Sequence, residues 1–143
     1  MRIYFSGAIS GGRENLSVYQ HIVTRLKALG HEVPSEHVAS TRVLEDEASV
    51  SPRAVFERDI GWIRVCDAMI AEVSTPSLGV GYEIARALQE GKKVLCLHKE
   101  GLFISKMVTG NPSPQLCLGA YLNTEDLDHQ IDRFLFQLGT GPF

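Results

Sequence analysis

Glu83 is the carboxylate whose surroundings in the sequence most favour chemistry. It lies in the first turns of a segment with helical periodicity that begins at Gly79-Val80-Gly81. One side of this segment is apolar and carries Val80, Ile84, Ala87 and Leu88. Glu83 lies about 60° from Val80 around the helix, at the edge of that apolar side. Apolar neighbours partly desolvate a carboxylate there, while the helix N-terminus favours its anion, a combination that suits a nucleophile or a general base.

A second carboxylate, Asp59, takes the equivalent edge position on a preceding helix. Pro52 is well placed to begin that helix, which we expect to run to about Val65. Its apolar side is formed by Val55, Phe56, Ile60 and Ile63. Asp59 lies about 60° from Phe56 around the axis. Its neighbours Glu57 and Arg58 are interpreted as ordinary charged surface.

Two turns have the composition of an anion-binding site. Gly7, Gly11 and Gly12 follow a β-prone run and permit the backbone to approach a ligand closely. Their G-x-x-x-G-G spacing differs from the dinucleotide fingerprint G-x-G-x-x-G. Ser77, just before Gly79, fits a helix N-cap, whose hydroxyl and exposed N–H groups can bind an anion without a lysine.

Strand and helix patterns alternate along the whole chain. The expected strands lie at residues 2–6, 31–34, 68–73, 93–97 and 115–121. Helical patterns cover residues 14–29, 52–65, 79–90 and 102–109, and Thr124 is the predicted N-cap of a closing helix. Residues 35–51, rich in Ser, Glu and Asp, are expected to form a long mobile loop. We predict one α/β domain over residues 1–143, a three-layer Rossmann-like (flavodoxin-like) fold with a five-stranded parallel sheet.

The predicted fold also indicates where a ligand would bind. In open parallel sheets, ligands sit beyond the carboxyl ends of the strands. The segments expected at that edge are residues 6–13, 35–51 and 74–79. They hold both turns described above.

Composition and charge narrow the range of partners. The chain of 143 residues is 44% hydrophobic and 22% charged, with a net charge of −3. Because it has neither a basic run nor an apolar stretch of about 18 residues, neither nucleic-acid binding nor membrane insertion is expected. The widely spaced cysteines are interpreted as thiols of a reducing compartment, and no signal peptide is evident, so we expect the cytoplasm, or the nucleus by diffusion. The histidines show no metal spacing, and no cofactor is expected.

Several segments together carry a resemblance to a known family. They are Tyr4-Phe5-Ser6-Gly7-Ala8-Ile9-Ser10-Gly11-Gly12-Arg13, Glu36-His37-Val38, Asp59 to Glu83 with the run PSLGVGYE, and, more weakly, Ser105-x-Met107. In this register, most of the chain resembles the 2′-deoxynucleoside 5′-phosphate N-hydrolases of the nucleoside 2-deoxyribosyltransferase superfamily. The resemblance implies one deoxyribosyltransferase-like domain. It also implies hydrolysis of the N-glycosidic bond of a deoxynucleoside monophosphate to a free base and 2-deoxyribose 5-phosphate.

The resemblance further implies roles for individual residues. Glu83 matches the family's nucleophile, which forms a covalent deoxyribosyl-enzyme intermediate that water then resolves. Asp59 matches a carboxylate near the nucleobase that helps protonate the leaving group, and Tyr4 matches a tyrosine that orients the nucleophile and the sugar. Ser77 matches a phosphate ligand, and Ser105 a serine that reaches the neighbouring subunit's phosphate site, which implies a homodimer. A carboxylate that traps an oxocarbenium-like centre, with a second carboxyl that holds a proton, is the chemistry of retaining glycosidases.

The remaining expected substrate contacts come mostly from turns. They are Gly7, Ile9, Ser10, Gly11, Arg13, His37, Gly79 and Met107. In the first loop, Ala8 stands where the family usually has a serine, and Ser10 where it usually has an arginine. Losing a guanidinium removes a charge-assisted contact worth on the order of 1.5–3 kcal/mol, unless Arg13 or the N–H groups of Gly11 and Gly12 replace it. These departures concern selectivity for the monophosphate and leave bond cleavage untouched.

Other interpretations stay open on the sequence alone. Tyr4 could serve only to pack a buried strand, and Ser77 could serve only as an N-cap. A deoxyribosyltransferase would trap the same Glu83 intermediate with a second base. The altered first loop could admit unphosphorylated or modified nucleosides. A non-catalytic nucleotide sensor is a third alternative, although a binder of anions gains nothing from two nearby carboxylates.

Overall fold

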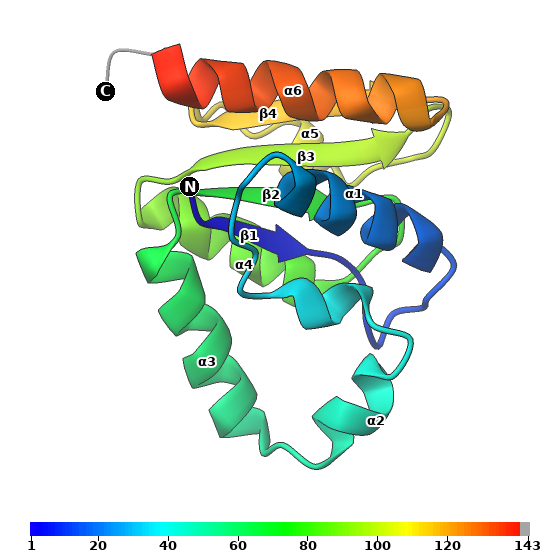
Figure 1. Ribbon diagram of the computed structural model, residues 1–143, viewed down its shortest axis with the longest axis vertical. Helices are drawn as coiled ribbons and strands as arrows, with labels where there is room; N and C mark the ends of the chain where they lie inside the picture. Colours follow the sequence, from blue (N-terminus) through cyan, green and yellow to red (C-terminus); the bar gives the residue numbers. More distant parts are fainter. Residues whose placement is uncertain (141–143) are drawn as a thin grey trace.

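Apolar runs of the chain form a parallel sheet, as expected. The computed structural model describes residues 1–140, and within them the sheet has four strands in the order β1-β2-β3-β4 (Figure 1). Their bounds are Ile3–Ser6 for β1, Ala68–Glu72 for β2, Lys93–Lys99 for β3 and Leu116–Tyr121 for β4. All neighbouring pairs are parallel. The α/β class with a parallel sheet is therefore confirmed.

The prediction of a fifth strand at residues 31–34 is wrong. That segment makes only an isolated parallel bridge, Arg2 to Glu32, beside the edge strand β1. Pro34 follows and has no N–H to extend a ladder. The chain then turns, and the Ser35 hydroxyl takes over the pairing, because it accepts from the Phe5 N–H at 2.8 Å and donates to the Phe5 carbonyl at 2.7 Å.

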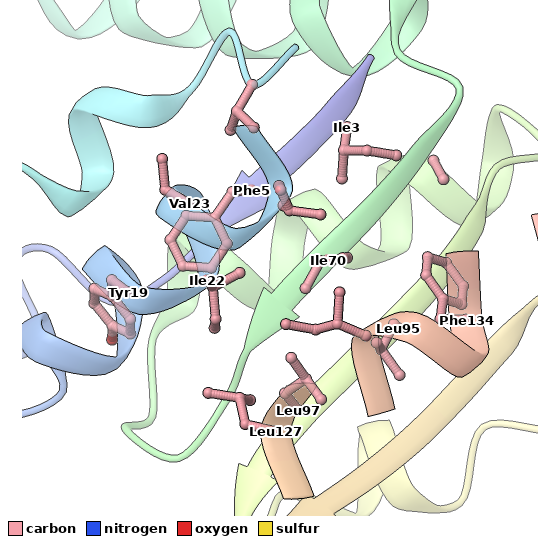
Figure 2. Close-up of a cluster of buried hydrophobic side chains, with 14 of the residues drawn as sticks. Ile3, Phe5, Tyr19, Ile22, Val23, Ile70, Leu95, Leu97, Leu127 and Phe134 are labelled. Carbon is pink, nitrogen blue, oxygen red and sulfur yellow. The ribbon is translucent and has the colours of Figure 1, made fainter. Parts of the chain in front are cut away.

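Helices cover both faces of the sheet and make three layers. Helices α1 (Leu16–Ala28) and α6 (Thr124–Thr140) lie in front of it in Figure 1, and α4 (Leu78–Gln89) lies behind. Figure 2 shows the front core, where side chains from β1, β2 and β3 meet those of α1 and α6. Its labelled members are Ile3, Phe5, Tyr19, Ile22, Val23, Ile70, Leu95, Leu97, Leu127 and Phe134.

A second core lies on the opposite face, under α3 (Pro52–Val65) and α4. Tyr4 of β1 belongs to it, together with Ile60 and Ile63 of α3 and Ile84 of α4. Tyr4 and Phe5 thus point to opposite faces, as strand alternation requires. The face that carries Tyr4 is the one on which both candidate carboxylates lie.

The helix starts follow the expected chemistry with one exception. Pro52 stands at the start of α3, and the Ser77 hydroxyl caps α4 by accepting from the Val80 N–H at 3.3 Å. The prediction that Thr124 caps the closing helix is wrong, because Thr124 is already helical. The amide oxygen of the preceding Asn123 accepts from the Asp126 N–H at 2.9 Å instead.

Residues 35–51 are not the long mobile loop that their polar composition predicts. They contain a short 3₁₀ helix, η1 (Glu36–Ala39), and the helix α2 (Val43–Ala48). Their buried anchors are few, namely Ser35 and small apolar side chains such as Val38 and Val43, which makes the helical pattern faint. The predicted helix at 102–109 is also shorter, because α5 covers only Lys106–Thr109. None of the helices in residues 1–140 is long and apolar enough to cross a membrane.

Candidate active site

The three segments predicted to meet at the carboxyl edge of the sheet do meet there. The first loop lies against the turn after β2, where a Cβ atom on Gly11 would come within 2.8 Å of the Pro76 carbonyl oxygen. The Asn15 amide donates to the Thr75 hydroxyl at 3.0 Å. Arg13 reaches the third segment, donating to the carbonyl of Val38 at 2.8 Å.

Tyr4 brings its hydroxyl to this edge from inside the second core. Its side chain is 2% exposed. Burial raises the pKa of Tyr4, and so do the negative charges of Glu83 and Asp59 and a hydrogen bond to Glu83. The phenol therefore stays protonated and acts as a donor toward Glu83. The Tyr4 hydroxyl is thus placed beside the carboxylate of Glu83.

Glu83 is a carboxylate held away from water. Burial raises its pKa to about 7, and the charge of Asp59 adds to that effect, while the hydrogen bond from Tyr4 and the charge of Arg58 oppose it. Its Oε2 atom is buried and has no hydrogen-bond partner within residues 1–140. The sequence predicts that desolvation raises the pKa of Glu83 and that the helix N-terminus lowers it. In the structure the net change is upward, as desolvation requires. Glu83 therefore exchanges its proton near neutral pH, well above the ordinary range of a glutamate.

Asp59 has a different environment from Glu83. The guanidinium of Arg58 donates from Nε to Asp59 Oδ1 at 2.9 Å, and the two side chains are 28% and 20% exposed. The interpretation of Arg58 as ordinary charged surface is therefore wrong. The two carboxylates therefore differ in environment, since Asp59 has a cationic partner and Glu83 has none in direct contact. In the free protein this difference runs opposite to the one expected for an ionised nucleophile and a proton-holding acid.

His37 also lies at this site, where it contacts Arg58. Nη2 of Arg58 is 3.2 Å from His37 Nε2 and donates to Glu47 Oε1 at 2.7 Å. His37 Nε2 is also 3.1 Å from Glu47 Oε1, so the tautomer of the ring decides whether this atom accepts from Arg58 or donates to Glu47. Burial and the charge of Arg58 lower the pKa of His37, while Glu47 and Asp59 oppose the shift.

Ser77 lies at a different part of α4, beside a large groove. The groove has a volume of about 900 Å³ and is lined by Ser77, Val80, Ile84, Phe103, Ser105 and Met107, among others. Tyr4, Asp59 and Glu83 do not line it. Within one chain, the structure therefore does not bring Ser105 and Met107 to the carboxylates.

Most of the first-loop residues make contacts within the protein that hold the loop in its conformation. A Cβ on Gly7 would lie 2.8 Å from the Tyr19 ring, so only glycine fits there. The Ala8 N–H donates to the Tyr19 hydroxyl at 3.0 Å. Arg13 donates to three carbonyl oxygens, those of Ala8, Val38 and Ser40, and is thereby engaged with protein acceptors. Ile9 is half-buried and Ser10 is exposed.

Sequence reasoning missed three residues of this region. Glu47 lies in a segment whose composition predicts a loop, and the surroundings of Arg58 predict charged surface. Ser6 is part of the family-like segment but has no predicted role; it is 2% exposed, and within the described part of the chain its hydroxyl has no hydrogen-bond partner. Strand alternation could have found Ser6, since it places this residue on the same face as Tyr4.

Among the residues that the structure describes, no group of three or more His, Cys, Asp or Glu side chains could hold a metal ion. The reactive groups gathered at this site are two carboxyl groups and a phenol.

Comparisons with known proteins identify the family. The chain matches the nucleoside 2-deoxyribosyltransferase family over residues 3–129. It is 41% identical to a Methanosarcina mazei protein named as a 2′-deoxynucleoside 5′-phosphate N-hydrolase, over 93% of this chain and 83% of that one. It is 44% identical to the 5-hydroxymethyl-dUMP N-hydrolase of Mus musculus, over 76% of this chain and 64% of that one.

Solved structures show the same fold. A CMP N-glycosidase of Clostridium botulinum superposes with a TM-score of 0.70 at 23% identity, covering 94% of this chain and 99% of that one. A 2-deoxyribosyltransferase of Bacillus psychrosaccharolyticus gives a TM-score of 0.66 at 20% identity, covering 90% of each chain. The match over residues 3–129 and the identity with the Methanosarcina protein place this chain in the nucleoside 2-deoxyribosyltransferase family.

Proposed function

We propose that the protein hydrolyses the N-glycosidic bond of 2′-deoxynucleoside 5′-monophosphates through a covalent intermediate on Glu83. The observation that carries the proposal is the Glu83 carboxylate, whose Oε2 atom is buried, which is hydrogen-bonded by Tyr4 and whose pKa is raised by the charge of Asp59. The names of relatives that are more than 40% identical, which are N-hydrolases of deoxynucleotides, support the same reaction.

The reaction has two steps. In the first, ionised Glu83 attacks C1′, the bond from C1′ to the base nitrogen breaks, and the base takes its electron pair and a proton from Asp59. In the second, water attacks C1′ of the glycosyl ester and gives its proton to Asp59, and Glu83 leaves as a carboxylate. The products are the free base and 2-deoxyribose 5-phosphate. The Tyr4 hydroxyl holds Glu83 in position during both steps.

The 5′-phosphate is assigned to the turn at Ser77. This turn offers the cap hydroxyl and the free N–H groups at the start of a helix of 12 residues. Gly11 lies against Pro76, so the first loop approaches the same turn. Because Arg13 is engaged with three carbonyl groups, it is a poor candidate to replace the arginine that relatives usually have at position 10.

A homodimer completes the proposal. Leu78, Phe103 and Met107 are 96%, 81% and 84% exposed along the groove that holds Ser105. A second copy would cover these apolar side chains and carry its Ser105 to the phosphate turn. Sedimentation should find a dimer, and a monomer that retains full activity would contradict this part of the proposal.

Base release tests the reaction itself. We expect chromatography to detect a free base from at least one deoxynucleoside monophosphate in a panel that includes dGMP. Glu83→Gln should abolish release, and Glu90→Gln should not, because Glu90 is an exposed carboxylate at the C-cap of the same helix, where it pairs with Arg86. No release from any substrate, or equal release by Glu83→Gln, would overturn the proposal. A new nucleoside formed on addition of a second base would instead show transfer.

A further inference from the structure

Arg58 is a charged residue of the site that the proposed reaction does not use. It lies on α3 directly before Asp59 and points toward α2 and η1, the short elements formed by residues 35–51. Its Nε atom donates to Asp59 Oδ1 at 2.9 Å, and its Nη2 atom donates to Glu47 Oε1 at 2.7 Å. The guanidinium thus joins a candidate catalytic carboxylate to a carboxylate on another helix. It does so with two N–H donors held in a fixed planar fork, which the single ammonium group of a lysine cannot reproduce.

The guanidinium is fixed from several sides. Its central carbon lies 5.0 Å from the centre of the Trp62 ring, one turn later on the same helix. His37 Nε2 of η1 is 3.2 Å from Nη2 and 3.1 Å from Glu47 Oε1, so the ring contacts both members of the Arg58–Glu47 pair. The Glu47 side chain is 18% exposed, so the contacts are shielded from water. Such partly buried, multiply bonded arginine pairs are worth more than exposed ion pairs.

Arg58 also supplies positive charge to a region that contains three carboxyl groups. Glu47 of α2, Asp59 of α3 and Glu83 of α4 all face this region, and the Tyr4 hydroxyl of β1 faces Glu83. The charges of Asp59 and Glu47 raise the pKa of Glu83, whereas the charge of Arg58 and the hydrogen bond from Tyr4 lower it. Removing the guanidinium would remove the positive charge that lowers the pKa of Glu83.

We propose that Arg58 is a positioning residue of the active site, which holds the Asp59 carboxyl toward the leaving base by anchoring it to Glu47 and Trp62. Arg58 contacts Oδ1 alone, so Oδ2 of Asp59 is left to meet the base. The same contacts tie α2 to α3 at the carboxyl edge of the sheet. This inference rests on the proposed reaction for the role of Asp59.

Kinetics of two Arg58 variants test the proposal. Arg58→Met removes the charge and the fork, and we expect kcat to fall roughly 10- to 100-fold with a smaller change in KM, because orientation of an acid acts on the chemical step. The rise of kcat/KM with pH should move upward by roughly 0.5 to 1 pH unit. Arg58→Lys keeps the charge without the fork, so it should restore the pH profile but not kcat.

Arg53→Met is the matched control. Arg53 lies on the same helix and pairs with Glu57 at 3.1 Å, but these side chains are 88% and 65% exposed. A purely structural role would lower Tm in Arg58→Met without moving the pH profile. If Arg58→Met matches the wild type or Arg53→Met in kcat and pH profile, the proposal is overturned.

A readout without turnover separates this proposal from the proposed function. The difference in Tm between Arg58→Met and Arg58→Met/Glu83→Gln, followed from pH 5 to 9, reports where Glu83 ionises. We expect this ionisation at higher pH than in the corresponding pair with native Arg58. An unchanged midpoint would overturn the proposal even if the enzyme is active, and absence of base release from every substrate would overturn only the proposed function.

Discussion

At the scale of single residues, the chemistry depends on a carboxylate that is costly to ionise. Glu83 must lose its proton before it can attack C1′, yet burial raises its pKa to about 7. Because of desolvation, only a small fraction of Glu83 is ionised at low pH. The ionised form, however, lacks the hydration shell that would make it a weaker nucleophile. Tyr4 offsets part of the cost by donating a hydrogen bond to the ionised form.

The activity should therefore rise with pH through the pKa of Glu83. Because kcat/KM reports ionisations of the free enzyme, we expect it to increase about tenfold per pH unit below pH 7 and to level off above. A pH series with one deoxynucleotide, at constant ionic strength, measures the midpoint. A rising limb centred near pH 4.5, the ordinary range of a glutamate, would show that Glu83 is not desolvated in solution.

Tyr4→Phe should shift the rising part of the pH profile to higher pH. The substitution keeps the buried ring and removes the donor, so the ionised form of Glu83 loses its hydrogen bond and the midpoint rises above pH 7. At pH 6 we expect a loss in kcat/KM of roughly 10- to 100-fold. Tyr82→Phe is the control, since Tyr82 precedes Glu83 on α4 and is 54% exposed. Equal pH profiles for the two variants would leave Tyr4 with a packing role.

At the scale of elements, the apolar runs and helix signals predict most of the framework. The strands β1 to β4 and the helix starts at Pro52 and Ser77 follow from local chemistry that tertiary contacts do not override. Residues 31–34 have a strand-like composition, but Pro34 and the Ser35 side chain end the ladder after one bridge. Local composition cannot show that a neighbouring serine will replace backbone pairing.

The site was predictable only in part for a similar reason. Glu83, Asp59 and Tyr4 carry recognisable surroundings in the sequence, and the structure brings them together. Arg58 and Glu47 do not, because their contact joins residues 11 positions apart on different helices. The desolvation of Glu83 likewise depends on α3 and β1 packing against α4. Such features arise from tertiary structure and leave no local signal.

The cap of α4 links stability to phosphate binding. Ser77→Ala removes the hydroxyl that accepts from the Val80 N–H, and we expect a loss of about 1 kcal/mol in the free energy of unfolding. If Ser77 also binds the 5′-phosphate, KM for a deoxynucleoside monophosphate should rise as well. Asn123→Ala, which uncaps α6, should cost similar stability without changing KM. A Ser77→Ala enzyme with native KM would limit Ser77 to capping.

At the scale of the whole molecule, Glu83 is expected to lower stability at the pH where it works. Its pKa is about 7 in the folded protein and 4.5 when unperturbed. The unfolded chain therefore releases this proton first as pH rises. Stability that is present below pH 4.5 is lost progressively up to about pH 7 and stays lost above it.

Glu83→Gln should consequently be more stable than the wild type in alkaline solution. The gain is expected to grow from near zero at pH 4 to about 3 kcal/mol at pH 8, measured by urea unfolding. Glu90→Gln should show no such gain, because Arg86 lowers the pKa of the exposed Glu90. A gain that does not depend on pH would contradict the assigned pKa of Glu83.

The covalent intermediate is the central claim, and denaturing mass spectrometry tests it most directly. Wild-type protein mixed with a hydrolysed deoxynucleotide and quenched in acid within the first turnover should carry one deoxyribose-phosphate group on the peptide that contains Glu83. Glu83→Gln should carry none. Base release without any adduct in the wild type, or an adduct on a different peptide, would contradict the account.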